Sequence, residues 1–364
     1  MKFELNEALI EEDFRSSALA SRVIANLPAG VPVRYVADAR AAMRATPGAN
    51  DPFGEGKRRM AIVRRRAPFL MGCPAGSREF ACCGYLVLVL ASNCPMDCSY
   101  CFLQEYVADN PTFQVYANYA DAFAELDRME RRDTGRLLRV GTGELADSLA
   151  FDSVTGISRD LVEYFARREN LLLELKTKTD EIANLLTIDP RGRTLVSWTL
   201  SPPRVFAASE HLTASPRARI TAARRVLDAG YKVGFHLDPI IIYDDAERDY
   251  MELLDSLFDL VKPGAISFIS MGGLRMTPRL RAAARARFPL DPMLVGEDVL
   301  SPDGRWRALA PVRLRTFSRL RERIVKAAPK LPVYLCMESP SAHRRVFGAE
   351  PETPAAIGSR LAGA

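Results

Sequence analysis

The stretch Ser92-Asn93-Cys94-Pro95-Met96-Asp97-Cys98-Ser99-Tyr100-Cys101-Phe102 decides the fold and points to the chemistry. Its three cysteines follow the pattern C-x3-C-x2-C, directly after an apolar run, 85–90, that predicts a buried strand. Pro95 and Asp97 favour a loop between the cysteines rather than a helix. Three thiolates on one short loop can converge on a single soft metal centre, whereas closed zinc sites and fully thiolate-bound clusters take four ligands. The stretch therefore predicts a metal centre: either a [4Fe-4S] cluster with one open iron, or a zinc loop completed by Cys82, Cys83 or a histidine.

The composition is that of a globular enzyme with a large core. The chain has 364 residues, of which 48% are hydrophobic and 26% charged. No apolar run approaches a membrane span, and the acidic N-terminus does not resemble a signal peptide. Seven cysteines, an odd number with a clustered trio, argue against a disulfide framework and predict a reducing, cytoplasmic location without a membrane partner. A net charge of +5 permits a polyanionic partner without demonstrating one.

The order of the predicted elements indicates three regions. Residues 1–80 read as a small mixed α/β segment, 81–345 as one large domain and 346–364 as a C-terminal tail. In the large domain, strands alternate with helices, which predicts a parallel sheet and an α/β fold of the partial (β/α)6-barrel type. The predicted strands are 86–90, 137–140, 171–175, 194–200, 232–237, 265–270 and 333–336. The predicted helices are 119–131, 159–168, 180–186, 216–228, 246–261, 278–287 and 312–328.

Polar residues gather at the predicted C-terminal ends of these strands, where reactive groups of such barrels lie. Gly141-Thr142-Gly143-Glu144 follows the second strand, and its glycines allow backbone to approach a ligand. Alternation places Lys176 with Lys178 on one face, and Ser197 with Thr199 on another. His236 stands beside Asp238 near the end of the fifth strand. It is either a satisfied core histidine or a catalytic group.

Two further features have more than one interpretation. The basic segment Lys57–Arg66 is either a solvated edge or a phosphate contact. Cys73, Cys82 and Cys83 are either buried structural cysteines or a second metal site, and their spacing fits no zinc pattern.

The cysteine motif after a first strand, with Tyr100 before its last cysteine, resembles the radical S-adenosylmethionine superfamily. The resemblance implies a [4Fe-4S] cluster on Cys94, Cys98 and Cys101, with S-adenosylmethionine as the second cofactor. It also implies that Glu144, after the two glycines, holds the amine of that cofactor. A reducing protein such as flavodoxin or ferredoxin would be the electron donor.

The segments Tyr-Cys-Phe-Leu-Gln, Leu-Lys-Thr-Lys, Ser-Trp-Thr-Leu-Ser-Pro, His-Leu-Asp-Pro-Ile and Gly-Gly-Leu-Arg narrow the resemblance to the spore photoproduct lyase family, over residues 80–350. The family implies a carbon–carbon bond lyase that repairs a thymine lesion in DNA. By the same resemblance, Lys178 and Thr199, with Ser197 beside it, would contact S-adenosylmethionine. Tyr100 and His236 are candidate catalytic residues.

The sequence departs from the repair lyases where those enzymes return a hydrogen atom. Glu144 stands in place of their donor cysteine, and Phe102 in place of their relay tyrosine. Cys336, at the end of the last strand, is either a substitute donor or a core residue.

Residues 299–309 predict a β-hairpin, because Asp303-Gly304 suits a tight turn. It resembles the lyase hairpin that enters DNA, although Ala308 replaces a tyrosine there. Arg305, Arg307 and Arg275 suit phosphates, and Trp306 suits stacking on a base, unless Trp306 simply packs on the barrel.

The leading hypothesis is a radical S-adenosylmethionine enzyme acting on damaged pyrimidines in DNA. The alternatives are the same chemistry on a peptide or small molecule, and a zinc-bearing nucleic-acid module.

Overall fold

The computed structural model describes residues 3–44, 49–73, 80, 83–133 and 135–363. Its largest sheet is a curled half-barrel of eight strands, in the order β18-β14-β13-β11-β10-β9-β5-β4. Every pairing is parallel except that of β4 with β5. The strands are β4 (Leu70–Gly72), β5 (Leu86–Leu88), β9 (Leu138–Gly141), β10 (Leu171–Thr177), β11 (Thr194–Thr199), β13 (Lys232–Ile240), β14 (Ile266–Gly273) and β18 (Val333–Leu335).

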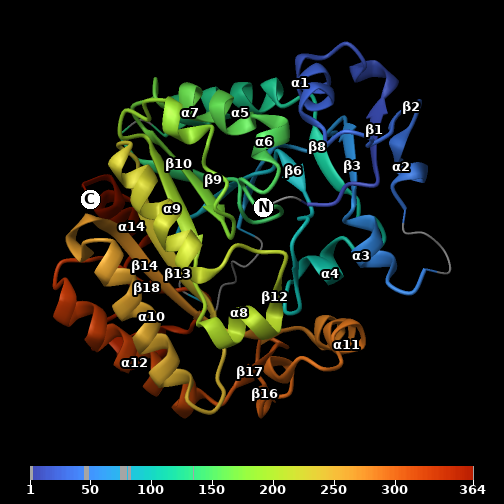
Figure 1. Cartoon of the computed structure of the whole chain (residues 1–364). Helices are drawn as coiled ribbons and strands as arrows, with labels where there is room; N and C mark the ends of the chain where they lie inside the picture. Colours follow the sequence, from blue (N-terminus) through green and yellow to red (C-terminus); the bar gives the residue numbers. More distant parts are fainter. Residues whose placement is uncertain (1–2, 45–48, 74–79, 81–82, 134, 364) are drawn as a thin grey trace.

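Helices cover the outer face of this sheet, with α7, α9, α10 and α12 following one another around it (Figure 1). The described helices of the large domain are α4 (Leu103–Tyr106), α5 (Ala120–Arg132), α6 (Asp152–Thr155), α7 (Ile157–Phe165), α8 (Pro203–Ser209), α9 (Pro216–Asp228), α10 (Ala246–Leu260), α11 (Pro278–Arg287), α12 (Ala310–Ala327), α13 (Pro340–Phe347) and α14 (Pro354–Gly363). Short 3₁₀ turns occupy Glu12–Phe14, Leu185–Thr187, Pro263–Ala265 and Pro292–Leu294.

A second sheet lies beside the barrel, in the order β2-β1-β3-β8-β6 (Figure 1). Its elements are β1 (Glu7–Glu11), α1 (Ala18–Asn26), β2 (Val33–Val36), α2 (Ala39–Ala42), α3 (Pro52–Gly56), β3 (Arg59–Val63), β6 (Ala91–Ser92) and β8 (Phe113–Tyr116). The two sheets exchange strands across the expected boundary at residue 80. β4 joins the barrel sheet, whereas β6 and β8 join the N-terminal one.

Two small sheets complete the fold. β7 (Asp97–Cys98) pairs antiparallel with β12 (Glu210–His211). The predicted hairpin is confirmed as β16 (Asp298–Leu300) and β17 (Trp306–Ala308), with β15 (Arg275–Met276) as a third strand. Gly304 has a φ of +74°, as the Asp-Gly turn requires.

The partial barrel is confirmed, since all seven predicted strands are present in one sheet. The helix predicted at 180–186 is wrong, because the described segment holds only the 3₁₀ turn Leu185–Thr187 there. The indole N–H of Trp198 donates to the carbonyl of Thr179 at 2.9 Å, which occupies the acceptor that a helix would need.

The C-terminal tail is helical. Ile357 of α14 packs with Leu172, Leu195, Phe268 and Tyr334 inside the barrel sheet. Among the described helices, none combines the length and apolar character of a membrane crossing.

Candidate metal centre and barrel mouth

The cysteine loop is held in place by contacts with several other segments of the chain. Its β7 segment pairs with β12, and the Asp97 carboxylate lies 3.2 Å from Lys57 Nζ and 2.9 Å from Arg287 Nη2. Burial favours a raised pKa for Asp97, but the charges of Lys57 and Arg287 lower it overall. Ser99 donates to the carboxylate of Asp291 at 2.5 Å. These contacts fix the loop before any ligand arrives.

The three cysteines of the motif share one electrostatic environment. Cys98 is buried, whereas Cys94 and Cys101 are half-buried. Burial raises the pKa of Cys94, and burial raises that of Cys98 to about 11; Cys101 adds to both shifts. Nearby cations act in the opposite direction: Lys57 on Cys94, and Lys178 and Lys57 on Cys98. The thiols thus lie within reach of one another, beside cations that favour thiolates.

The donor set of the loop is three thiols. Among the described residues, no three His, Cys, Asp or Glu side chains converge closely enough to enclose one metal ion. Thiolates are the usual ligands of a [4Fe-4S] cluster, each on a different iron, so Cys94, Cys98 and Cys101 have the right chemistry for three of its irons. Cys82, one suggested fourth zinc ligand, lies outside the described residues.

Lys178 joins the cysteine loop to the barrel. Its Nζ lies 3.7 Å from Cys98 Sγ, 2.5 Å from the Tyr100 hydroxyl and 3.0 Å from Glu210 Oε1. Tyr100 also donates to Glu210, which is ion-paired at 2.6 Å with fully buried Arg219. Burial would raise the pKa of Glu210, but Lys178 and Arg219 lower it well below its usual range. The ionised carboxylate therefore holds Lys178 and Tyr100 against the loop.

A second group of charges lines the mouth of the barrel. Asp238 binds Arg275 through two contacts of 2.8 and 3.1 Å, and Arg275 Nη2 lies 4.0 Å from Cys336 Sγ. Burial alone would lower the pKa of Lys176, but the negative charges of Glu144 and Asp238 raise it overall. The negative charge of Glu144 also contributes to the raised pKa of Arg275. Glu144, which follows β9, and Cys336, which follows β18, thus lie close enough to Lys176 of β10 to affect its pKa.

Ser197 and His236 lie one layer deeper, in a buried polar network. Ser197 donates to Glu174 at 2.6 Å and is fully buried. His236 Nε2 lies 2.9 Å from Glu174, and its Nδ1 lies 2.6 Å from the Ser270 hydroxyl. Arg139 pairs with the same carboxylate at 2.5 Å. Because the Ser197 hydroxyl and both ring nitrogens of His236 have partners in this network, we propose that these two residues serve the core rather than cofactor binding or catalysis.

The predicted nucleic-acid residues are divided between core and surface. Arg307 is 2% exposed and donates to Asp303 at 2.7 Å and to the Met337 carbonyl at 3.1 Å. It is therefore not available for a phosphate, and Arg275 is held by Asp238. Arg305 is half-buried beside Asp303, and Arg281 lies 4.4 Å over the ring of half-buried Trp306. Arg305 and Trp306 stay candidates for the surface contact.

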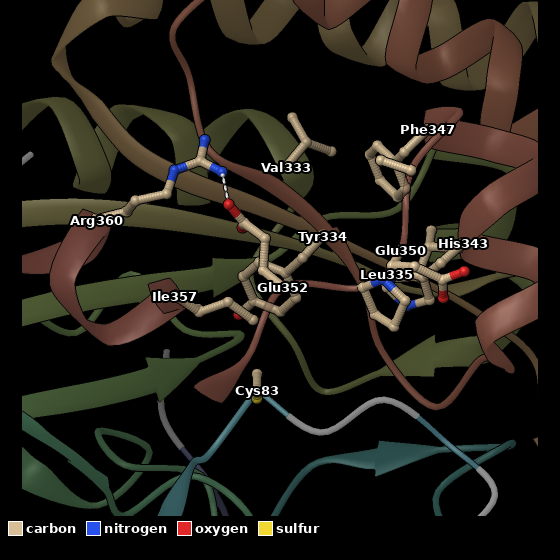
Figure 2. Close-up of a pocket in the computed structure, with 12 residues that line it drawn as sticks. Cys83, Val333, Tyr334, Leu335, His343, Phe347, Glu350, Glu352, Ile357 and Arg360 are labelled. Atoms are coloured by element: carbon tan, nitrogen blue, oxygen red, sulfur yellow. Dashed lines mark hydrogen bonds and ion pairs between the residues drawn. The ribbon is translucent and has the colours of Figure 1, made fainter. Parts of the chain in front are cut away.

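A cavity of about 180 Å³ lies away from the cysteine loop, between β18, α13 and α14 (Figure 2). Cys83, Tyr334 and Phe347 line it, and Arg360 pairs with Glu352 at its edge. It contains no residue of the cysteine motif, so it is not the candidate site.

Sequence reasoning missed the groups that hold the site together. Lys57 is buried and bonded to Met96 and Asp97, although it belongs to a segment that read as solvated or phosphate-binding. Arg219 lies in the first turn of α9, where no sequence pattern marks it as buried. Glu210 lies in a two-residue strand without any motif. Thr199 was singled out correctly as a barrel residue, but it is 2% exposed and its carbonyl accepts from Arg219 at 2.9 Å.

Comparison with known proteins places the chain in a family. The family model "Spore photoproduct lyase" matches residues 29–289. The spore photoproduct lyase of Clostridium acetobutylicum is 27% identical over 218 residues, which cover 59% of this chain and 62% of that protein. That of Geobacillus sp. (strain Y412MC61) is 30% identical over 195 residues, covering 54% and 55%. The chain thus matches less than two thirds of the length of these relatives.

Solved structures support the fold over a longer range. A spore photoproduct lyase complexed with dinucleoside spore photoproduct has a TM-score of 0.80 at 21% identity, covering 92% of this chain and 99% of that one. A mutant with bound AdoMet and the same dinucleoside has a TM-score of 0.79, also at 21% identity. The fold is therefore shared along nearly the whole chain. Because the family model matches well over half of the residues, the chain belongs to the spore photoproduct lyase family.

Proposed function

We propose that this protein is a radical S-adenosylmethionine enzyme that acts on a damaged pyrimidine in DNA. The observation that carries the proposal is the cysteine loop: three thiols in one electrostatic environment beside the mouth of a partial barrel, with Lys178 3.7 Å from Cys98. Membership of the family and the ligands of the solved lyases support the same chemistry.

In this proposal Cys94, Cys98 and Cys101 would hold a [4Fe-4S] cluster. With S-adenosylmethionine and an electron donor such as flavodoxin or ferredoxin, that cluster would supply a 5′-deoxyadenosyl radical. The protein provides position and charge. Lys57 and Lys178 offset the charge of the thiolates, and Glu210 keeps Lys178 and Tyr100 in place.

Glu144 would accept from the ammonium group of S-adenosylmethionine. It follows Gly143, whose Cα lies so close to the side chain of Lys176 that an added Cβ would stand 2.5 Å from Lys176 Cβ. Only glycine lets the backbone at position 143 pack this closely on β10, and this packing positions the backbone from which Glu144 projects. Lys178 and Thr199 stay assigned to the nucleoside half of the cofactor by family resemblance.

The hairpin would contact DNA. Val299 and Leu300 are 41% and 56% exposed beside Trp306 and Arg305. Exposed apolar side chains can wedge between bases, and an arginine beside them can meet a phosphate.

The first test is anaerobic reconstitution with iron and sulfide, followed by reduction with dithionite in the presence of S-adenosylmethionine. We expect iron and sulfide in a cluster ratio and release of 5′-deoxyadenosine. Cys98→Ala should lose both, whereas Cys73→Ala, outside the motif, should keep both. A wild-type protein that binds a full cluster and releases no nucleoside contradicts the proposal.

The second test concerns the substrate. Ultraviolet-irradiated DNA is incubated with the reduced enzyme, and its nucleosides are analysed by mass spectrometry. We expect loss of a pyrimidine photoproduct in proportion to the 5′-deoxyadenosine formed. Unchanged lesions with continued nucleoside release contradict DNA repair.

A non-nucleic-acid substrate is the second candidate, because two of the expected phosphate ligands, Arg275 and Arg307, are held by internal carboxylates. Gel shift with duplex DNA separates the two. Binding that weakens steeply with salt supports DNA, whereas no binding even at low salt supports a peptide or small molecule. Zinc without iron or sulfide in the purified protein would instead favour a zinc-bearing module.

A further inference from the structure

Cys336 lies at the mouth of the barrel, directly after β18. Its backbone N–H donates to the Met271 carbonyl at 2.7 Å, which extends the pairing of β18 with β14. Its side chain is half-buried, with Arg275 4.0 Å from the sulfur. Burial raises the pKa of Cys336 well above its usual value, and the charge of Asp238 adds to the shift against the smaller effect of Arg275. The sulfur therefore carries its hydrogen at neutral pH.

Lys176 stands beside this thiol without a partner. Its ammonium group makes no hydrogen bond or ion pair to any residue that the structure describes, and the charges of Glu144, Asp238 and Cys336 act on it. The side chain is half-buried at the mouth of the barrel, so its ammonium group is open to an acceptor on a bound ligand. The carbonyl oxygens of a pyrimidine are acceptors of this kind.

A second polar group in the lumen is also unsatisfied. Tyr85 is 8% exposed, and its hydroxyl has no hydrogen-bond partner within the described part of the chain. The Gly143 amide lies nearby without the geometry of a hydrogen bond. A Cβ at Gly141 would stand 1.9 Å from this hydroxyl, so glycine there is what admits Tyr85. The charge of Glu144 acts on both Tyr85 and Lys176, and Gly143 contacts Lys176.

We propose that Cys336 donates the hydrogen atom that ends the reaction, while Lys176 holds a carbonyl oxygen of the pyrimidine beside it. This inference rests on the proposed function. The substrate radical left after hydrogen abstraction and bond cleavage takes a hydrogen atom from Cys336. One S–H bond breaks, one C–H bond forms, and a thiyl radical remains. A small thiol reductant then returns one hydrogen atom to the sulfur, and two of the small thiyl radicals so formed couple to a disulfide.

The other described cysteines are placed less well for this step. Cys94, Cys98 and Cys101 are committed to the cluster in the proposed function. Cys83 lines the separate cavity beside α13 and α14 (Figure 2). Glu144 and Phe102 carry neither a thiol S–H nor a phenolic O–H that exchanges with solvent. Cys336 is thus the described thiol that shares the mouth of the barrel with the unpartnered cation.

The test uses the reconstituted enzyme with dinucleoside spore photoproduct in D₂O. Because a thiol hydrogen exchanges with solvent, the wild-type product should carry one deuterium. Cys336→Ser should still form 5′-deoxyadenosine, but we expect at least about tenfold less repaired dinucleotide and no solvent deuterium in it. Lys176→Met should weaken substrate binding by about tenfold. Cys73→Ser is the matched control and should behave as wild type.

A second measurement does not depend on turnover. Without S-adenosylmethionine, the dinucleoside should slow alkylation of Cys336 by N-ethylmaleimide, detected by mass spectrometry, and leave Cys73 unaffected. Lys176→Met should remove this protection. The inference is overturned if Cys336→Ser repairs with solvent deuterium at the wild-type rate, or if the dinucleoside gives no protection. If the wild-type enzyme releases no 5′-deoxyadenosine, the result contradicts the proposed function rather than this inference.

Discussion

At the residue scale, Glu210 is the group on which the cysteine loop depends most. It ties Lys178, Tyr100 and Arg219 together, and both it and Arg219 are fully enclosed. Removing one partner of a buried ion pair leaves an uncompensated charge. Glu210→Ala should therefore lower the free energy of unfolding by about 3–5 kcal/mol, measured by urea denaturation. Asp255→Ala, which breaks the exposed pair with Arg323, should change it by no more than about 0.5 kcal/mol.

His236 gives the residue-scale pH dependence. Burial, with the charge of Lys176, lowers its pKa to about 4 from 6.5, so the folded protein holds it neutral. Below pH 6.5, His236 binds a proton in the unfolded chain but stays neutral in the folded chain until the pH nears 4. The stability is therefore complete above pH 6.5 and is lost as the pH falls toward 4. When the pH falls from 7.5 to 5, His236 should lower the free energy of unfolding by about 2 kcal/mol, measured by urea denaturation.

His236→Gln should flatten that slope, since glutamine has no proton to gain. A residual slope in the same direction is expected from His343, whose pKa is also lowered by burial. An unchanged slope in His236→Gln would show that the histidine is not held neutral.

At the element scale, the close approach of β9 to Tyr85 should be sensitive to a single methyl group. A Cβ at Gly141 would meet the Tyr85 hydroxyl at 1.9 Å, whereas one at Gly72 meets nothing within 4 Å. Gly141→Ala should destabilise the protein by about 1–3 kcal/mol in thermal or urea unfolding, and Gly72→Ala should not. Tyr85→Leu in the Gly141→Ala background should recover part of the loss. A loss that the second substitution leaves unchanged would mean that the two residues do not meet.

The same scale shows what the sequence could predict. Helices α9 and α11 begin where expected because Ser215 and Thr277 cap them and a proline follows each cap. The barrel strands were predictable from their apolar, β-branched runs. The cysteine loop and the residues at the strand ends were found by spacing and alternation.

What the sequence could not show depends on contacts between distant residues. The ion pairs of Glu210 with Lys178 and Arg219, and of Asp97 with Lys57 and Arg287, have no local pattern. Strand β8 escaped prediction because it is short and joins a sheet whose other main strands precede it by about fifty residues or more. Strand alternation predicted that the side chains of Ser197 and His236 face the inside of the barrel. It could not predict how deep they lie, nor that both form hydrogen bonds with Glu174.

At the scale of the whole molecule, the N-terminal region is part of the site rather than an appendage. β8 pairs with β3, and Lys57, which follows α3, is buried against the cysteine loop through Asp97 and Met96. A chain that begins at residue 81 would lose β1, β2 and β3, and β8 would keep β6 as a partner but lose β3. It would expose the edge of β8 and leave Asp97 with one cation fewer.

We therefore expect the chain from residue 81 to aggregate or to unfold without a cooperative transition, and to bind little iron after reconstitution. The full chain should unfold in one transition by circular dichroism and by tryptophan fluorescence, because Trp198 and Trp306 lie in the barrel and hairpin while circular dichroism reports both sheets. Lys57→Met in the full chain separates the two effects. It removes the cation but keeps β1–β3, so it should retain the cooperative transition and lose cluster more quickly in a chelator. A truncated chain that folds cooperatively and binds a full cluster would show that the N-terminal sheet is dispensable to the loop.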